Sequence, residues 1–80
     1  MNITQASQAL FSAYANDAAN WGGTPLVGGN VGRTKADCGN LTDLKKLGLL
    51  TTFDHDGYMW VQFTAEGVAY AAELGIDLTN

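Results

Sequence analysis

The chain has 80 residues, a formal net charge of −4, and 46% hydrophobic against 15% charged residues. This length predicts a single domain, residues 1–80, and the apolar fraction is too high for an intrinsically disordered chain. We expect no membrane span, because no apolar run approaches the roughly 20 residues that one requires, and no secretory signal, because the first residues carry no base. The single cysteine excludes an internal disulfide and is typical of a reducing compartment, so we expect a cytoplasmic protein.

The basic residues are gathered in one part of the chain. All four lie between Arg33 and Lys46, and because this segment also holds two acids it carries a formal charge of +2. The rest of the chain holds the other six acids and no base, which gives −6. The negative total argues against a strongly basic nucleic-acid binder. The polarised distribution hints at a functional surface, and chance clustering in a lysine-poor chain is the alternative.

A first helix is predicted from Thr4 to Trp21. Apolar residues recur there every three or four positions, which is typical of a helix with one buried stripe. Thr4 or Asn2 can cap its start, and Gly22 with Gly23 ends it. The stripe consists of Ile3, Ala6, Leu10, Tyr14, Ala18 and Trp21.

The next stretch, 22–32, holds five of the 10 glycines and the only proline. It has no phosphate-loop signature, and its glycines lack the preceding strand and following helix of a dinucleotide-binding fingerprint. We interpret it as tight turns around a short strand or helical turn at Pro25–Val27, with Leu26, Val27 and Val31 packing inward. Dense glycine also allows the backbone to approach a partner closely, which stays open as an alternative.

A second helix is predicted from Thr34 to Leu47, and Gly48 ends it. Thr34 and Asp37 have the spacing of a capping box. Helical periodicity assigns four residues to the buried side and five to the outward side. The buried side is Cys38, Leu41, Leu44 and Leu47, and the outward side is Lys35, Gly39, Thr42, Asp43 and Lys46.

Gly39 is the unusual residue of this second helix. Glycine in a helix interior costs ~1 kcal/mol relative to alanine. Either another backbone or a phosphate approaches closely at this position, or the helix begins later, near Asn40. Both interpretations stay open from the sequence.

A β-hairpin is predicted around a four-residue turn at Asp54–Gly57, with Phe53 facing Tyr58 across it. Because side chains alternate along a strand, one face is buried and the other gathers three aromatic rings. The aromatic face either supports the hairpin by cross-strand packing or forms a partner or dimer surface. The buried face is Leu50, Thr52, Met59, Val61 and Phe63, and the aromatic face is Leu49, Thr51, Phe53, Tyr58, Trp60 and Gln62.

The last predicted helix runs from Ala65 to Leu74, and Thr64 caps its start. Gly75 followed by Ile76 is typical of a Schellman ending, in which the residue after the glycine packs back on the helix. The predicted order is therefore helix, short segment, helix, hairpin and helix.

The sequence lacks the residue pattern of an enzyme. The single histidine, His55, lies in the hairpin turn, and no second base or nucleophile stands at a fixed helical or strand spacing. Cys38 falls on the apolar side of its helix, where an inert buried thiol is expected. Asp54, His55 and Asp56 offer metal ligands, but three ligands on one mobile turn make a weak site. We expect no catalytic residues, no cofactor and no metal site.

The element order resembles a winged-helix domain, and two motifs strengthen the resemblance. Leu44-Lys45-Lys46-Leu47-Gly48-Leu49-Leu50 is similar to the L-x-x-x-G-L-[LIV] stretch that ends the recognition helix of winged-helix repressors. Phe63-Thr64-Ala65-Glu66-Gly67 is similar to the [LF]-T-x-x-G stretch that follows their wing. The resemblance covers about residues 34–75 and implies a small α+β fold, a winged helix-turn-helix-like domain with three helices and a β-hairpin in the C-terminal half.

Two features depart from the family pattern. The wing tip carries acidic residues where basic ones are usual, and the glycine-rich stretch replaces the helix that precedes the recognition helix. The departing residues of the tip are Asp54, His55 and Asp56.

The resemblance implies a DNA-binding transcription regulator. In the family, the helix matching Thr34–Leu47 lies in the major groove of duplex DNA, and the hairpin matching Thr51–Phe63 touches the adjacent groove or backbone. Because one copy offers few cations, tight binding would require a dimer. The residues that face DNA by position are Lys35, Thr42 and Lys46, with Arg33 and Lys45 contacting phosphate at the edges.

A protein-interaction module is the second hypothesis that the resemblance implies, because winged-helix folds also serve as docking domains. Phe53, Tyr58 and Trp60, together with the net negative charge, suit a protein partner. The size of the chain and the stretch Asn20–Pro25 resemble small bacteriophage proteins. The partner is then a host protein in the host cytoplasm, or a second copy in a self-associating virion component, and neither hypothesis involves a small-molecule substrate.

Overall fold

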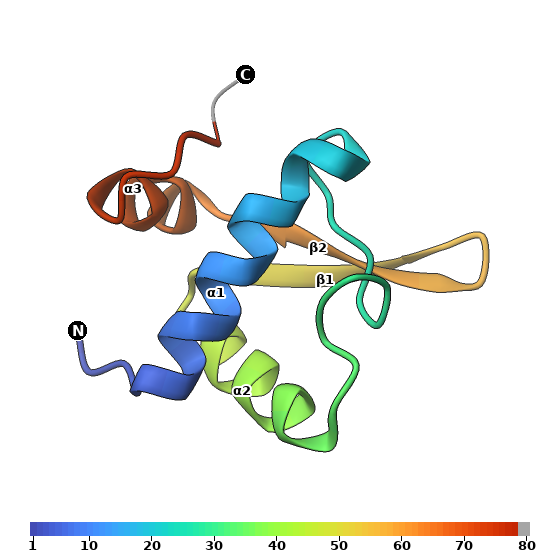
Figure 1. Cartoon of the computed structure of the whole chain (residues 1–80), viewed down its shortest axis with the longest axis horizontal. Coiled ribbons are helices and arrows are strands. Elements are labelled where there is room, and N and C mark those ends of the chain that lie inside the picture. Colours follow the sequence, from blue (N-terminus) through green and yellow to red (C-terminus); the bar gives the residue numbers. More distant parts are fainter. Residues whose placement is uncertain (79–80) are drawn as a thin grey trace.

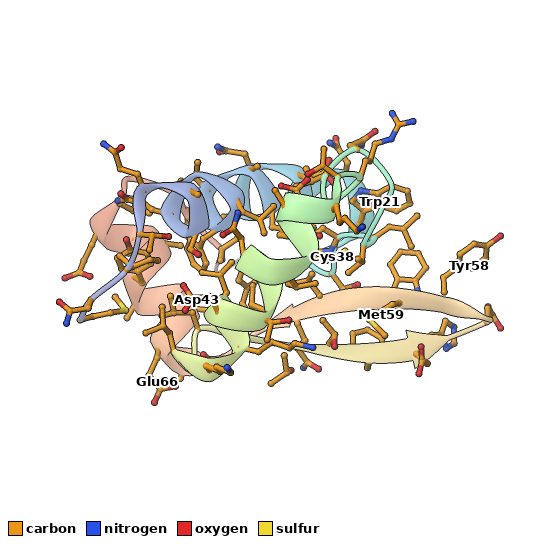
Figure 2. The ribbon with its side chains drawn as sticks, turned by 90° about the horizontal axis from the view of Figure 1, so that it is seen from below. Trp21, Cys38, Asp43, Tyr58, Met59 and Glu66 are labelled. Atoms are coloured by element: carbon orange, nitrogen blue, oxygen red, sulfur yellow. The ribbon has the colours of Figure 1, made fainter. Side chains whose placement is uncertain are left out.

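The computed structural model describes residues 1–78 as a small α+β domain in which helices pack on a two-stranded antiparallel sheet. Helix α1 lies on one face of the hairpin in both views (Figures 1 and 2). Helix α3 and the hairpin tip lie at opposite ends of the long axis (Figure 1). The elements are α1 (Gln5–Asp17), the 3₁₀ helix η1 (Ala18–Trp21), α2 (Lys35–Lys46), β1 (Leu50–His55), β2 (Tyr58–Phe63) and α3 (Ala65–Glu73).

The predicted helix starts are confirmed, because each threonine cap makes its hydrogen bond. Thr4 accepts from the backbone N–H of Ser7. Thr34 and Asp37 form both hydrogen bonds of a capping box at the start of α2. Thr64 accepts from the N–H of Gly67, which fixes the first turn of α3.

The predicted glycine endings of α2 and α3 are also confirmed. Gly48 and Gly75 have φ values of 76° and 82°, in the left-handed region that side chains disfavour. The N–H of Ile76 reaches back to the carbonyl of Ala71 at 2.8 Å, which is the long hydrogen bond of a Schellman motif. Leu49 makes the equivalent bond after α2.

The first helix is shorter than predicted. Its α-helical part ends at Asp17, and the chain continues as the 3₁₀ turn η1 before Gly22 ends it with a φ of 68°. The physical reason is local: the side chains of Asn20 and Trp21 both donate to the Asp17 carboxylate, which tightens the last turn.

The core joins one face of α1 to α2, the sheet and α3. Phe11 is fully buried and packs against Phe63 and Tyr70, with ring centroids 5.6 and 5.1 Å apart. The predicted stripe of α1 missed Phe11 and wrongly included Ala6, which is exposed. The core residues are Leu10, Phe11, Tyr14, Ala15, Leu41, Leu44, Leu49, Leu50, Val61, Tyr70 and Ala71.

The predicted hairpin exists, but its turn and register differ from the prediction. His55 pairs with Tyr58, and Phe53 pairs with Trp60 rather than with Tyr58. The turn has two residues, Asp56 and Gly57, both with positive φ, which is the arrangement whose twist matches that of the strands. The observed pairing differs from the prediction by two residues. Because side chains alternate with a period of two, each strand residue stays on the sheet face that was predicted for it.

Two expected positions on the hairpin faces are nevertheless wrong. Leu49 is buried rather than on the outer face, because β1 begins at Leu50 and Leu49 still belongs to the helix ending. Met59 was expected on the buried face but is 40% exposed, since it lies near the projecting tip.

The glycine-rich stretch contains a short extended segment at Pro25–Val27. The prediction of a short strand there is confirmed, and the alternative of a helical turn is wrong. The N–H of Val27 donates to the carbonyl of Met59 at 2.9 Å, and the N–H of Val61 donates to Pro25 at 2.8 Å. These two bonds cover the outer edge of β2. At the far end of the stretch, a Cβ on Gly32 would overlap the hydroxyl of buried Tyr14, so the loop packs directly on α1.

Candidate functional site

The outward side of α2 carries the basic residues of the chain. Because α2 begins at Lys35 and not near Asn40, the late-start interpretation of Gly39 is wrong. The five residues predicted to contact DNA all lie on α2 or directly before it, and all are exposed. They are Arg33, Lys35, Thr42, Lys45 and Lys46.

Gly39 lies in the middle of this surface and has no intramolecular reason to be glycine. It is exposed, and a Cβ built on it would meet no atom within 4 Å. A helix interior loses about 1 kcal/mol by carrying glycine in place of alanine. The other interpretation drawn from the sequence, that another backbone or a phosphate approaches Gly39, stays a prediction, and within the described residues no atom lies within 4 Å of a Cβ built there.

The buried side of α2 is rotated from the prediction. Cys38 was expected to be buried and is exposed, and Asp43 was expected outside and is half-buried. Ser7 of α1 causes this rotation, because its hydroxyl donates to Asp43 Oδ2 at 2.8 Å and lies 3.4 Å from Asn40 Oδ1. A polar tertiary contact therefore sets the roll of the helix, and the cysteine faces solvent (Figure 2).

The charges of α2 follow its dipole and are not neutralised by neighbouring acids. Asp37 lies in the first turn and Lys45 and Lys46 in the last, which is the stabilising arrangement at each end. Within residues 1–78, no lysine or arginine lies within 4.0 Å of an acidic side chain, and the one such contact of a histidine joins His55 Nε2 to Asp56 Oδ2 at 3.4 Å, in the hairpin turn. The four cations near α2 are therefore available to an external anion.

The aromatic face of the hairpin divides into exposed and supporting rings. Phe53 and Tyr58 are 37% and 60% exposed, and Tyr58 points away from the ribbon at the tip (Figure 2). Trp60 is half-buried: it packs edge-on against Trp21 with centroids 5.6 Å apart, and its Nε1–H donates to the carbonyl of His55 at 3.1 Å. Of the three predicted partner-binding residues, Trp60 serves the fold.

A hydrogen-bonded cluster around the buried carboxylate of Asp17 was not predicted from the sequence. The Asp17 side chain accepts from the amides of Asn20 and Asn30 at 2.8 and 2.9 Å, and from the indole of Trp21 at 2.8 Å. Burial raises the pKa of Asp17, but the three hydrogen bonds outweigh it, so the pKa lies below its ordinary value. The cluster ties the glycine-rich stretch to the end of α1.

Tyr14 completes this buried polar region. Its side chain is fully buried, and its hydroxyl has no hydrogen-bond partner among the described residues. Burial, with smaller electrostatic contributions from Asp37, Cys38 and Asp17, raises the pKa of Tyr14 to about 12. The hydroxyl therefore stays protonated at neutral pH and packs against Gly32.

The described part of the chain contains no group of three histidine, cysteine or acidic side chains that could hold a metal ion. None of the helices in residues 1–78 is long and apolar enough to cross a membrane. Comparisons with protein-family models, with curated proteins and with solved structures found no match for this chain.

Proposed function

We propose that the protein is a small DNA-binding regulator with a winged-helix type of domain, in which α2 enters the major groove of duplex DNA. The observation that carries the proposal is the surface formed by Arg33 and the outward side of α2, where all four basic residues are exposed and none pairs with an acidic side chain of residues 1–78. Phosphate contacts by such cations dominate the affinity of proteins for DNA.

The dimensions of α2 suit this role. It has 12 residues and is therefore about 18 Å long, and a major groove about 12 Å wide admits one helix. Lys35, Thr42 and Lys46 recur along one outward row and would face base edges, since lysine and threonine both hydrogen-bond to bases. Gly39 in the same row would let the helix backbone approach the groove floor.

The hairpin makes a smaller contribution to the proposed interface. Asp54 and Asp56 are exposed at its tip, and phosphate would repel both carboxylates. Binding therefore depends on α2 and on Arg33 directly before it. The affinity of one copy is modest because four cations neutralise few phosphates.

The direct test is titration of the protein into a fluorescently labelled duplex at ~50 mM salt, where electrostatic binding is strong. Replacing Lys35 by alanine should weaken binding several-fold, and Thr42→Ala should change the preference among duplex sequences. Thr51→Ala is the matched control, because Thr51 is an exposed threonine that lies on β1 and not on α2. If the protein at micromolar concentration shows no detectable binding to the duplex, the proposed DNA binding is wrong.

Docking of a protein partner on the hairpin is the second candidate function. The observation in its favour is the exposure of Phe53, Tyr58 and Met59 on a projecting element. The double variant Phe53→Ser, Tyr58→Ser should release a co-purifying host or virion protein while leaving DNA binding unchanged. A partner that remains bound to this variant would exclude the hairpin as the docking surface.

A further inference from the structure

An open groove of about 700 Å³ lies between the last turn of α2 and helix α3. Its apolar lining consists of Met1, Leu47, Leu49, Ala69 and Tyr70, of which Leu49 and Tyr70 are buried. No residue of β1 or β2 lines the groove, and α3 lies at the end of the molecule opposite the hairpin tip (Figure 1), so the groove is distinct from the aromatic surface described above.

The two walls of the groove carry opposite charges. Lys46 lies on the α2 wall, and Glu66 and Glu73 lie on the α3 wall. All three residues are exposed, and none forms an ion pair within residues 1–78. Glu66 points outward from the start of α3 (Figure 2).

The outward side of α3 is shaped to pack against another helix. Ala65, Ala69 and Ala72 are exposed and lie four and three positions apart, so they form one row of small side chains. Such a row allows two helix axes to approach closely, and Glu66 and Glu73 both lie beside it on the side that faces the groove.

We propose that the groove binds the α3 helix of a second copy of this chain in a two-fold symmetric dimer. The alanine row of one copy then packs over the apolar lining of the other, and Lys46 meets the glutamates of the partner's α3. Because the dimer has a two-fold axis, the packing of the alanine row and the pairing of Lys46 with the glutamates each occur twice.

Charge complementarity selects this occupant over other partners. A basic peptide in the groove would be attracted by the glutamates and repelled by Lys46. An acidic peptide would be attracted by Lys46 and repelled by the glutamates. A second copy supplies both signs in the required places, because the lysine and the glutamates line the same groove. The N-terminal half of α2, with Arg33 and Lys35, stays outside this interface and remains available to DNA. In the dimer, Lys46 pairs with the glutamates of the partner copy and no longer faces DNA.

Sedimentation equilibrium of the full chain without DNA tests the dimer, so its outcome is separate from that of the proposed DNA binding. The double variant Glu66→Lys, Glu73→Lys and the single variant Lys46→Glu should each weaken dimerisation about tenfold or more, because each change acts twice in a symmetric interface. Combining all three substitutions should restore the dissociation constant to within roughly threefold of wild type, because the walls again carry opposite charges.

Two matched controls separate the groove from the rest of the surface. Lys45→Glu changes an exposed neighbouring lysine that does not line the groove, and it should leave dimerisation unchanged. Ala69→Gln fills the groove and should abolish the dimer, whereas Ala36→Gln on α2 should not. A wild-type protein that stays monomeric at about 200 μM, or a dimer insensitive to the groove variants, would overturn the proposal.

Discussion

The hydroxyl of Thr64 donates a hydrogen bond of 2.6 Å to the carbonyl oxygen of Gly48, and this contact joins the start of α3 to the end of α2. The same hydroxyl accepts from the N–H of Gly67 at 3.0 Å, and the N–H of Thr64 donates to Leu49 at 3.2 Å. These bonds join the motif Gly48–Leu50 to the motif Phe63–Gly67 and give a physical reason why both occur in this chain. They also fix α3 beside α2 and thereby form the groove between them.

Gly67 is required where α3 crosses the end of α2. A Cβ on this residue would overlap the carbonyl oxygen of Leu49, which is backbone and cannot move without disturbing β1. We therefore expect Gly67→Ala to lower the free energy of unfolding by about 2–4 kcal/mol. Urea denaturation followed by circular dichroism measures the change, and an effect below about 0.5 kcal/mol would contradict the close packing.

Gly39 should respond in the opposite direction. Because it is exposed and a Cβ meets no atom within 4 Å, Gly39→Ala should stabilise the protein by about 0.5–1 kcal/mol. If the glycine lets DNA approach α2, the same variant should bind duplex DNA several-fold more weakly. A variant that is more stable and binds DNA as well as wild type would show that Gly39 has no role in the interface.

The Asp17 cluster should make stability depend on acid pH. The pKa of Asp17 is lowered on folding from its ordinary value of 3.8, so the unfolded state binds more protons and the stabilisation is present above that value. It is lost as the pH falls below 3.8 through the pKa of the folded protein. Asp17→Ala should lower stability by about 2–3 kcal/mol at neutral pH and flatten the acid profile.

The prediction for Asp17 is checked by urea denaturation at several pH values between neutral and strongly acidic. Asp54→Ala is the matched control, because Asp54 is an exposed acid on β1 whose backbone lies outside the left-handed region. A wild-type stability that rises below pH 3.8 would contradict the assigned direction of the pKa change.

The aromatic residues of the hairpin should separate into two classes in stability measurements. Trp60→Ala removes the contact with Trp21 and the hydrogen bond to His55, so we expect a loss of about 2–3 kcal/mol. Tyr58→Ala should change stability by less than about 0.5–1 kcal/mol, since its ring is mostly exposed. Thermal denaturation of both variants checks the assignment, and equal losses would contradict it.

Helix ends were predictable because their signals are local. Thr34 with Asp37, and Gly75 with Ile76, act through neighbours within one turn, so their sequence spacing determines their hydrogen bonds. The exposure of the α2 cations was predictable for a similar reason, since long charged side chains are rarely buried without a partner.

The failed predictions depend on contacts between distant parts of the chain or on one unusual backbone angle. The Ser7 hydroxyl donates a hydrogen bond to Asp43, which lies 36 positions after Ser7. This bond turns Asp43 toward α1, and Cys38 on the same helix is then exposed. The helical periodicity of apolar residues counts a cysteine as apolar, so it assigns Cys38 to the buried side of α2. A hydrogen bond between distant residues cannot be read from this periodicity. The hairpin register depends on the φ of 54° at Asp56, and the pair Asp56-Gly57 is the sequence signal from which this two-residue turn could have been predicted.

The salt dependence of binding to duplex DNA tests the central claim most directly. If the cations of α2 contact phosphates, the logarithm of the binding constant should fall with the logarithm of salt concentration, with a slope of about −2 to −4 per bound copy. Lys45→Ala should make that slope shallower by about 1. A slope near zero, or one that Lys45→Ala leaves unchanged, would contradict the assignment of α2 as the DNA-binding surface.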